Sequence, residues 1–493
     1  MAKWEQRGAR EERGVMQAIL DRYAHGAFFD EFSDAEGIPR SHYAGLARTL
    51  RSIEWHELQH RVAVINDVLL RRGVTFAVYG DAGGIERILP FDLIPRIVPA
   101  DEWAMLARGL AQRVYALNAF LVDIYGPQQI LRDGVVPWDL VFSAKFFARE
   151  MIGVKVPGGV YIHVSGIDLI RGGDGTYYVL EDNVRTPSGI SYVLENRDVL
   201  KRSFPRLFEH YRPLPVDDYP LRLRAALTNA APFGNVEPTI VVLTPGIFNS
   251  AYFEHTLLAR LMGVELVEGQ DLIVRDNVVY MKTTAGLQRV DVIYRRIDDD
   301  SLDPLYFRVD STLGVVGLLD AYRAGNVALA NAIGSGAADD KAIYPYVPAM
   351  IEYYLGEDPV LPNVPTYDCT DAAQRRHAIA HLEELVVKSV NQSGGYGMLI
   401  GPSSTRAERA QFAAAIEAAP REFIAQPVIP LSCHPTVVTD GLAPRHVDLR
   451  PYVLYGREVD VPPCALTRVA LNEGSLVVNS SQGGGSKDTW FLE

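Results

Sequence analysis

The side chains best suited to hold a metal ion are Asp168, Glu181 and Asn183, which supply two carboxylates and an amide. Glu181 and Asn183 are two residues apart in an alternating run, so a β-strand places both on one face. All-oxygen ligands suit a hard cation, and a set this small leaves coordination positions for water and phosphate oxygens. The pattern favours Mg²⁺ held jointly with a nucleotide. The alternative is a solvent-facing hairpin whose acids bind no metal.

A β-hairpin must bring these side chains together. Asp174-Gly175 lies between two alternating runs, GIDLIR and TYYVLEDN, and predicts a two-residue turn. With that turn, Asp168 lies opposite Glu181, with Cβ atoms about 5 Å apart, and Asn183 lies opposite Gly166. Like charges directly opposite each other destabilise a sheet, so this arrangement calls for a cation.

Arginines follow the hairpin closely. Arg185 and Arg197 flank a Thr-Pro-Ser-Gly turn, and Arg296 follows an apolar run that continues into three aspartates. Guanidinium groups make two-point contacts with phosphate or carboxylate oxygens. Acids for a metal and arginines for an anion in one stretch indicate a metal–phosphate site. Arg197 has two possible roles, binding substrate or capping its own helix.

Lys388 lies on a predicted strand, LVVKSV, which is followed by the glycine-rich segment SGGYG at 393–397. Backbone N–H groups in such a loop can form a concavity for anions, although many hairpins also contain glycines. The order differs from the P-loop, in which the lysine follows the glycines. Lys341 lies before another helical run, and for it alone a surface position is the simpler interpretation.

The remaining elements predict an α/β protein of several domains. Residues 1–75 and 100–126 have helical spacing, whereas TIVVLTPG, SAYFEHTLLARLMG and VELVEG form a βαβ pattern typical of a parallel sheet. We expect a mostly helical region at 1–110, a unit with the metal ligands at 111–215, a βαβ domain at 216–340 and a lid with the C-terminal part at 341–493. Proline-rich segments at 211–220 and 357–367 are the best linker candidates.

The composition and the distribution of apolar residues argue against several classes of protein. The chain has 493 residues, 48% of them hydrophobic, and a net charge of −13, which argues against general nucleic-acid binding. No apolar run reaches the length of a membrane span, and the charged start lacks the apolar core of a secretory signal. Three dispersed cysteines fit a reducing compartment. We expect a cytoplasmic protein with no nucleic-acid or membrane partner.

With these segments in view, the sequence resembles the circularly permuted type 2 ATP-grasp proteins, distantly similar to the synthetase domain of glutathionylspermidine synthetase. The resemblance covers the chain from about residue 159 to the C-terminus, and residues 1 to about 110 add little to it. The segments that carry it are GIDLIR, YYVLEDNVRTPSGISYVLENR, PGIFNSAYFEHTLLARLMGVELVEGQDL, VDVIYRRIDDDSLDPL, GNVALANAIGSGAADDKAIYPYVP, KSVNQSGGYGMLIGP and NSSQGGGSKDTW. It implies a circularly permuted ATP-grasp fold with ATP and Mg²⁺ as cofactors.

The resemblance also implies roles for individual residues. Asp168, Glu181 and Asn183 match the family's Mg²⁺ ligands, and Lys341 and Lys388 match its two phosphate-binding lysines. The residues that match its phosphate cover and its adenine-binding hinge are Ser393, Gly394, Gly395 and Gly397, and Gln426 and Val428. One position departs from the pattern, because the related enzymes have Arg-x-Asp where this chain has Gly166. The missing arginine must come from elsewhere, with Arg171 and Arg185 as candidates.

The expected activity is ATP-dependent ligation of a carboxylate to an amine through an acyl phosphate. A small-molecule or peptide carboxylate and an amine are the expected partners, and Arg185 and Arg296 are the candidates for holding the carboxylate or the acyl phosphate. Glu254 and His255 are possible bases, with helix packing as the alternative. A cysteine hydrolase built on Cys433 and His434 is a poorer interpretation. The serious alternative is a non-catalytic Mg·ATP-binding scaffold.

Overall fold

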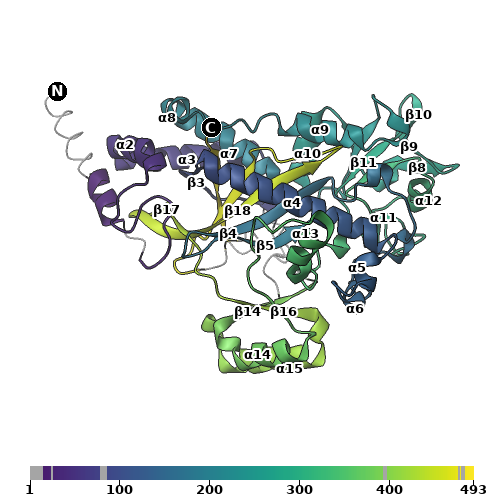
Figure 1. Ribbon diagram of the computed structural model, residues 1–493. Helices are drawn as coiled ribbons and strands as arrows, with labels where there is room; N and C mark the ends of the chain where they lie inside the picture. Colours follow the sequence, from purple (N-terminus) through teal and green to yellow (C-terminus); the bar gives the residue numbers. More distant parts are fainter. Residues whose placement is uncertain (1–14, 24–25, 78–85, 392–396, 476–477, 479–483) are drawn as a thin grey trace.

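The structure is a computed structural model that describes residues 15–23, 26–77, 86–391, 397–475, 478 and 484–493. It has a large body, with a small lobe below it (Figure 1). Strands from both halves of the chain build the central sheet of the body. The protein is therefore mixed α/β, as its sequence predicts.

The central sheet has the strand order β3-β21-β20-β18-β4-β5, with β17 and β19 paired to β18. The bounds are β3 (Phe91–Val98), β4 (Val164–Arg171), β5 (Tyr177–Asn183), β17 (Cys433–Val438), β18 (Gly441–Tyr455), β19 (Val459–Asp460), β20 (Ala465–Val469) and β21 (Gly485–Phe491). The hairpin β4–β5 thus ends a sheet whose other strands come mostly from the C-terminal third. The long helix α4 (Ala100–Ile124) crosses the body in front of it (Figure 1).

A second, parallel sheet has the order β12-β11-β6-β7. Its strands are β6 (Ile240–Leu243), β7 (Glu265–Val267), β11 (Val292–Arg295) and β12 (Ala328–Ala330), and α10 (Tyr252–Met262) links β6 to β7. The predicted βαβ unit is therefore confirmed. An antiparallel sheet lies beside it in the same part of the chain, formed by β8 (Leu272–Arg275), β9 (Val278–Thr283) and β10 (Gly286–Arg289).

The lower lobe is a four-stranded sheet, β13-β16-β14-β15, with two helices on one face (Figure 1). Its elements are β13 (Tyr367–Asp368), α14 (Ala372–Ala380), β14 (Leu385–Ser389), β15 (Met398–Ile400), α15 (Arg406–Ala418) and β16 (Phe423–Pro427). Val387, Leu399 and Ala425 belong to the lobe's own apolar core, which includes Ala378 and Ile416 from the helices. The opposite face of the sheet, which carries Lys388, points away from this core.

Most of the remaining helices surround the body. They are α2 (Ala44–Ser52), α3 (Trp55–Arg71), α5 (Gln129–Arg132), α6 (Trp138–Phe142), α7 (Ile190–Ser203), α8 (Pro205–Tyr211), α9 (Tyr219–Asn229), α11 (Asp299–Leu302), α12 (Leu318–Arg323) and α13 (Val347–Leu355), and a short ribbon, β1 (Thr75–Ala77) with β2 (Glu86–Ile88), follows α3. The predicted division at 110/111 falls inside α4, and β3 joins the central sheet. The division into four domains otherwise stays a prediction.

The hairpin turn differs from the predicted one. Gly172 and Thr176 close the loop through a 2.9 Å hydrogen bond, so three residues, 173–175, form it, with Gly175 at φ +81°. The prediction of a two-residue turn is wrong by one residue. A bulge at Leu180 compensates, because Leu169 pairs with Val179 whereas Asp168 pairs with Glu181.

The described helices include none that is both long and apolar enough to cross a membrane.

Candidate nucleotide and metal site

The two predicted metal carboxylates face each other across the hairpin. Asp168 on β4 pairs with Glu181 on β5, and Gly166 pairs with Asn183, as the sequence predicts. The intervening Asp182 points to the other face, where its carboxylate binds Arg113 through bonds of 2.6 and 2.7 Å. The alternation of the strand therefore separates a structural ion pair from the candidate site.

Asp168 is buried and bound by two arginines. Arg450 on β18 donates to both carboxylate oxygens, with Nη2 2.7 Å from Oδ2, and Arg468 on β20 donates to Oδ2 at 2.6 Å. Burial by itself would raise the pKa of Asp168, but the two guanidinium groups outweigh it and hold the pKa well below its ordinary value. Asp168 is therefore ionised at neutral pH.

Glu181 is more open and lies among lysines. Its Oε2 is 3.6 Å from the Lys341 ammonium, and its Oε1 is 4.0 Å from Nη2 of Arg450. Lys388 reaches the same place from the lobe, since its charge interacts with Glu181, Lys341 and Asp168. Burial lowers the pKa of Lys388 to about 8, an effect that Glu181 opposes and Lys341 reinforces.

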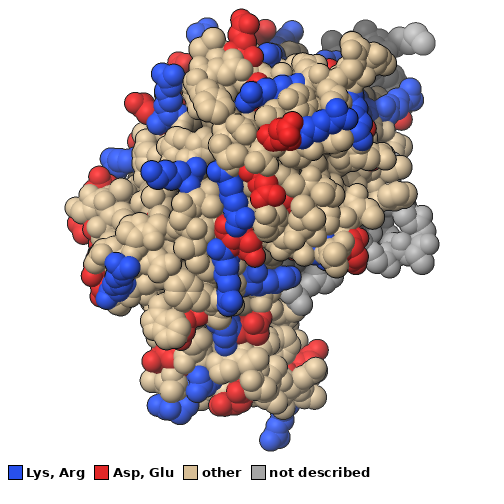
Figure 2. All heavy atoms as spheres, turned by 90° about the vertical axis from the view of Figure 1, so that its right-hand side faces the viewer, with Lys and Arg blue, Asp and Glu red and all other residues tan. Residues whose placement is uncertain are grey.

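The charge balance changes the argument for a metal. Asp448 completes the group by accepting from Arg468 at 3.0 Å, so three carboxylates meet four cations, namely Arg450, Arg468, Lys341 and Lys388. The facing carboxylates do have cations beside them, but these are side chains, so repulsion between the carboxylates does not by itself require a metal. The excess of positive charge instead suits a polyanion. Figure 2 shows basic side chains, with acids between them, running down one face to the narrowing above the lower lobe.

Mg²⁺ fits this group as part of a complex with phosphates. Two carboxylates and an amide on one face give a partial oxygen ligand set, which phosphate oxygens and water can complete. The described residues contain no group of three or more His, Cys, Asp or Glu that could hold a metal by themselves. The buried Nδ2 of Asn183 has no hydrogen-bond partner among the described residues. An unsatisfied buried amide here is consistent with a missing ligand.

Arg450 lies beside Gly166, because a Cβ on Gly166 would be 3.4 Å from Cδ of Arg450. Arg450 is therefore a further candidate for the missing arginine, besides Arg171 and Arg185. Arg171 already binds Glu31 and Glu102, at 3.2 and 3.0 Å, and the source of the arginine stays a prediction.

The lobe presents several predicted nucleotide residues on one face. Lys388 pairs with Ile424 and Val386 pairs with Gln426, so Lys388 and Gln426 share a face of the sheet. The Lys388 ammonium makes no hydrogen bond or ion pair with any residue that the structure describes. Gln426 donates to Oγ1 of Thr366 at 2.9 Å, and the N–H of Val428 lies 3.4 Å from the Glu384 carbonyl.

Of the four glycine-rich loop residues predicted to cover the phosphates, the structure describes only Gly397. Gly397 closes the base of the β14–β15 hairpin, where its carbonyl accepts from the Ser389 N–H at 3.2 Å. Ser393, Gly394 and Gly395 lie outside the described residues, and their predicted role stays a prediction.

Arg185 lies two residues after the end of β5, the strand that carries Glu181 and Asn183. Its guanidinium stacks 3.9 Å from the centre of the Phe146 ring and is near Asp339 and Asp298, at 3.3 and 3.6 Å. The side chain is 20% exposed, and its buried Nε has no hydrogen-bond partner among the described residues. Arg185 is therefore partly exposed and paired with two aspartates, and its predicted role in holding the carboxylate substrate stays a prediction.

Arg296 has a different environment. Its guanidinium is buried, where it bonds the Tyr294 hydroxyl at 3.0 Å and the Glu254 carboxylate at 3.3 Å. Glu254 in turn accepts from the N–H groups of Gly189 and Ser191, at 2.7 and 3.1 Å, at the start of α7. These contacts are those of a structural ion pair. The substrate-holding role of Arg296 stays a prediction that its burial disfavours.

His255, Arg197 and Cys433 all have surroundings that indicate structural roles. Burial, with Arg296 nearby, lowers the pKa of His255 to about 2, and its Nδ1 lies 2.9 Å from the Thr244 hydroxyl. Arg197 bonds Asp488 at 2.8 Å and thereby fastens α7 to β21, a role that differs from both predicted ones. Burial raises the pKa of the Cys433 thiol to about 12, which does not suit a nucleophile.

Sequence reasoning missed Arg450 and Arg468. They lie 282 and 300 residues from Asp168 along the chain, in strands of the C-terminal third. The available signal was the burial of Asp168 in a central strand, because a buried carboxylate needs a partner.

Comparisons with known proteins show the family of the chain. Residues 95–470 match the family model described as circularly permuted ATP-grasp type 2. A glutathione synthetase-like effector (GSS30) from Globodera pallida, solved in its apo form, aligns with a TM-score of 0.59 at 12% identity, over 89% of this chain and 98% of that one. That likeness concerns the fold alone. The chain belongs to the circularly permuted type 2 ATP-grasp family.

Two relatives show how far the similarity extends. A Synechocystis protein, uncharacterized protein sll0335, is 57% identical over 96% of this chain and 99% of its own length. A Frankia alni protein provisionally named glutamate–cysteine ligase 2-3 is 47% identical over 97% of this chain, which spans 55% of that protein. Family membership implies ATP binding.

Proposed function

We propose that the protein is an ATP-dependent carboxylate–amine ligase that forms an amide bond and releases ADP and phosphate. The observation that carries the proposal is the convergence of Lys388 from the lobe with Lys341, Glu181 and Asp168 from the body. A nucleotide bound between lobe and body would place its phosphates among these side chains. Family membership supports the nucleotide, and the charge excess supports the phosphates.

Each residue has a task in this proposal. Asp168, Glu181 and Asn183 would hold Mg²⁺, which would neutralise phosphate charge when bound. Lys341 and Lys388 would bind phosphate oxygens, and Gln426 and Val428 would lie beside the base. Arg450 contacts Asp168 and approaches Glu181, so its guanidinium can stabilise the anion that forms as the carboxylate is phosphorylated. Arg185 would hold the carboxylate substrate.

Family membership supports this reaction class. In phosphoryl transfer the protein mainly positions the reactants and stabilises charge, and the described site supplies cations for that purpose. The carboxylate attacks the γ-phosphorus, ADP leaves, and the amine displaces phosphate from the acyl phosphate. The name of the Frankia relative supports an amino-acid carboxylate as the substrate class.

The test follows ADP release while amino acids and short peptides are supplied in pairs as carboxylate and amine. ADP release that requires both partners supports the ligase. Mg·ATP binding without such turnover, across the whole set, would favour a non-catalytic scaffold. A Lys388→Ala variant serves as the negative control, and Lys155→Ala, an exposed lysine, serves as its matched control.

A further inference from the structure

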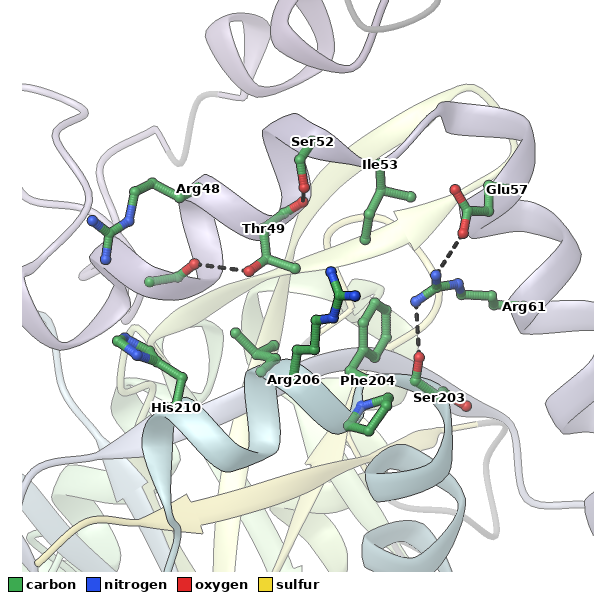
Figure 3. Close-up of a pocket in the computed structure, with 13 residues that line it drawn as sticks. Arg48, Thr49, Ser52, Ile53, Glu57, Arg61, Ser203, Phe204, Arg206 and His210 are labelled. Carbon is green, nitrogen blue, oxygen red and sulfur yellow. Dashed lines mark hydrogen bonds and ion pairs between the residues drawn. The ribbon is translucent and has the colours of Figure 1, made fainter. Parts of the chain in front are cut away.

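A separate basic pocket lies where the N-terminal helices meet α7 and α8. It has a volume of about 600 Å³, which is in the range of small-molecule sites. Figure 3 shows its lining, in which Arg206 rises from α8 between Thr49 and Phe204. The α2 and α8 helices lie at the upper left of Figure 1, far from the lower lobe that carries Lys388. The pocket is therefore not part of the nucleotide site.

Two hydrogen bonds between helices hold the walls of the pocket in place. At one end the Leu46 N–H of α2 donates to the Tyr211 hydroxyl of α8 at 2.9 Å. At the other end Arg61 of α3 donates to the Ser203 carbonyl at the end of α7 at 2.8 Å. Gly45 allows the close approach, because a Cβ there would lie 2.9 Å from the His210 ring. The pocket is thus preformed.

The charges that line the pocket are unbalanced. Three arginines, Arg48, Arg61 and Arg206, and one acid, Glu57, line the pocket. That acid is already paired with Arg61 at 2.5 Å. Neither Arg48 nor Arg206 makes an ion pair or a side-chain hydrogen bond with any residue in the described part of the chain. Both side chains are exposed at the pocket, so they give it an excess of positive charge that is available to an anion.

A neighbouring pocket provides the contrast. It also contains arginines, but Arg72 pairs with Glu195 at 2.8 Å and with Asp198 at 2.6 Å, and Arg202 pairs with Asp198 at 3.1 Å. Two of its three arginines are thus paired with acids that line the same pocket, whereas the α2–α8 pocket has one acid for its three arginines.

The floor of the pocket is apolar. Ile53, Phe204 and Leu207 are buried beneath the basic rim, and the Arg61 guanidinium lies 4.7 Å from the centre of the Phe204 ring. Hydroxyl groups of Thr49 and Ser52 are also part of the lining. Bidentate guanidinium groups above an apolar floor suit an anion with an apolar body.

We propose that this pocket is a second ligand site, which binds a small organic anion, a phosphate ester or carboxylate with an apolar portion. Residues 45–61, which form half of it, precede the segment that matches the family model. The proposal is independent of the ligase reaction.

Calorimetric titration of the full chain tests it, with phenyl phosphate and inorganic phosphate as probes. Saturating Mg²⁺ and a non-hydrolysable ATP analogue keep the probes out of the nucleotide site. We expect one phenyl phosphate per chain, bound more tightly than inorganic phosphate and more weakly at high salt. The double variant Arg48→Gln/Arg206→Gln should bind phenyl phosphate about tenfold or more weakly, because charge-assisted hydrogen bonds are lost.

The matched control is Arg132→Gln/Arg275→Gln, which removes two exposed arginines elsewhere and should bind as the parent does. The pocket variant should unfold at the same temperature as the parent, since Arg48 and Arg206 have no partners to lose among the described residues. If it fails to fold, the single variants provide the comparison. Absence of phenyl phosphate binding to the parent, or equal binding by parent and pocket variant, would overturn the proposal.

Discussion

Arg450 makes a two-point ion pair with Asp168, so the first candidate metal ligand is also the anchor of a partly buried arginine. Arg468 shares the same carboxylate. Asp168 and Glu181 face each other across one hairpin, yet the first holds the sheet together and the second lies open to the lysines. Because of this difference, we expect Asp168→Asn and Glu181→Gln to have different effects on stability and on nucleotide binding.

Asp168→Asn should destabilise the fold. Loss of the carboxylate charge leaves Arg450 and Arg468 short of a buried partner, and breaking a buried ion pair costs about 3–5 kcal/mol. Urea denaturation measures the change in the free energy of unfolding. A variant as stable as the parent would show that the arginines do not depend on Asp168.

Glu181→Gln should leave the fold nearly unchanged and weaken Mg²⁺-dependent nucleotide binding. Glu181 is 27% exposed and lies 3.6 Å from Lys341, and such partly exposed pairs contribute less than about 1 kcal/mol. Calorimetry with a non-hydrolysable ATP analogue, with and without Mg²⁺, measures the effect. Equal Mg²⁺ dependence in variant and parent would remove Glu181 from the ligand set.

Nucleotide binding should take up a proton near pH 8. Burial lowers the pKa of free Lys388 to about 8, and bound phosphates would favour the charged ammonium and raise it. The affinity for the ATP analogue should therefore fall as pH rises through 8. Titrations in buffers of different ionisation enthalpy count the protons. No uptake between pH 8 and 9, or uptake that persists in Lys388→Ala, would exclude Lys388 as its source.

Arg296→Met tests a structural against a substrate role. Glu254 would lose its buried partner at the start of α7, so we expect a loss of about 3–5 kcal/mol in stability. Arg185→Met should change stability less and raise KM for the carboxylate substrate. The reverse pattern, a stable Arg296→Met with raised KM, would restore the substrate role of Arg296.

The sequence predicted the elements of the site better than its electrostatics. Alternation in β4 and β5 was enough to pair Asp168 with Glu181, although the turn was wrong by one residue and the bulge at Leu180 restored the register. Local patterns also identified the βαβ unit. They placed Lys388 on a strand, which is β14 of the lower lobe. These predictions rest on residues close together in the chain.

The partners of Asp168 could not be found in this way. Arg450 and Arg468 reach it only because β18 and β20 join the sheet of β4, a pairing that no local pattern specifies. The same holds for the pocket between α2 and α8, whose walls are brought together by tertiary contacts such as that of Leu46 with Tyr211. The charge balance of the site and of the pocket depends on these tertiary contacts, so local sequence patterns could not predict it.

The most direct test of the central claim is ADP release by the full chain with Mg·ATP and paired carboxylates and amines. We predict release that requires both partners, that is lost in Lys388→Ala and that persists in Lys155→Ala. Tight Mg·ATP binding with no release that depends on an amine, for any pair supplied, would contradict the assignment of a ligase.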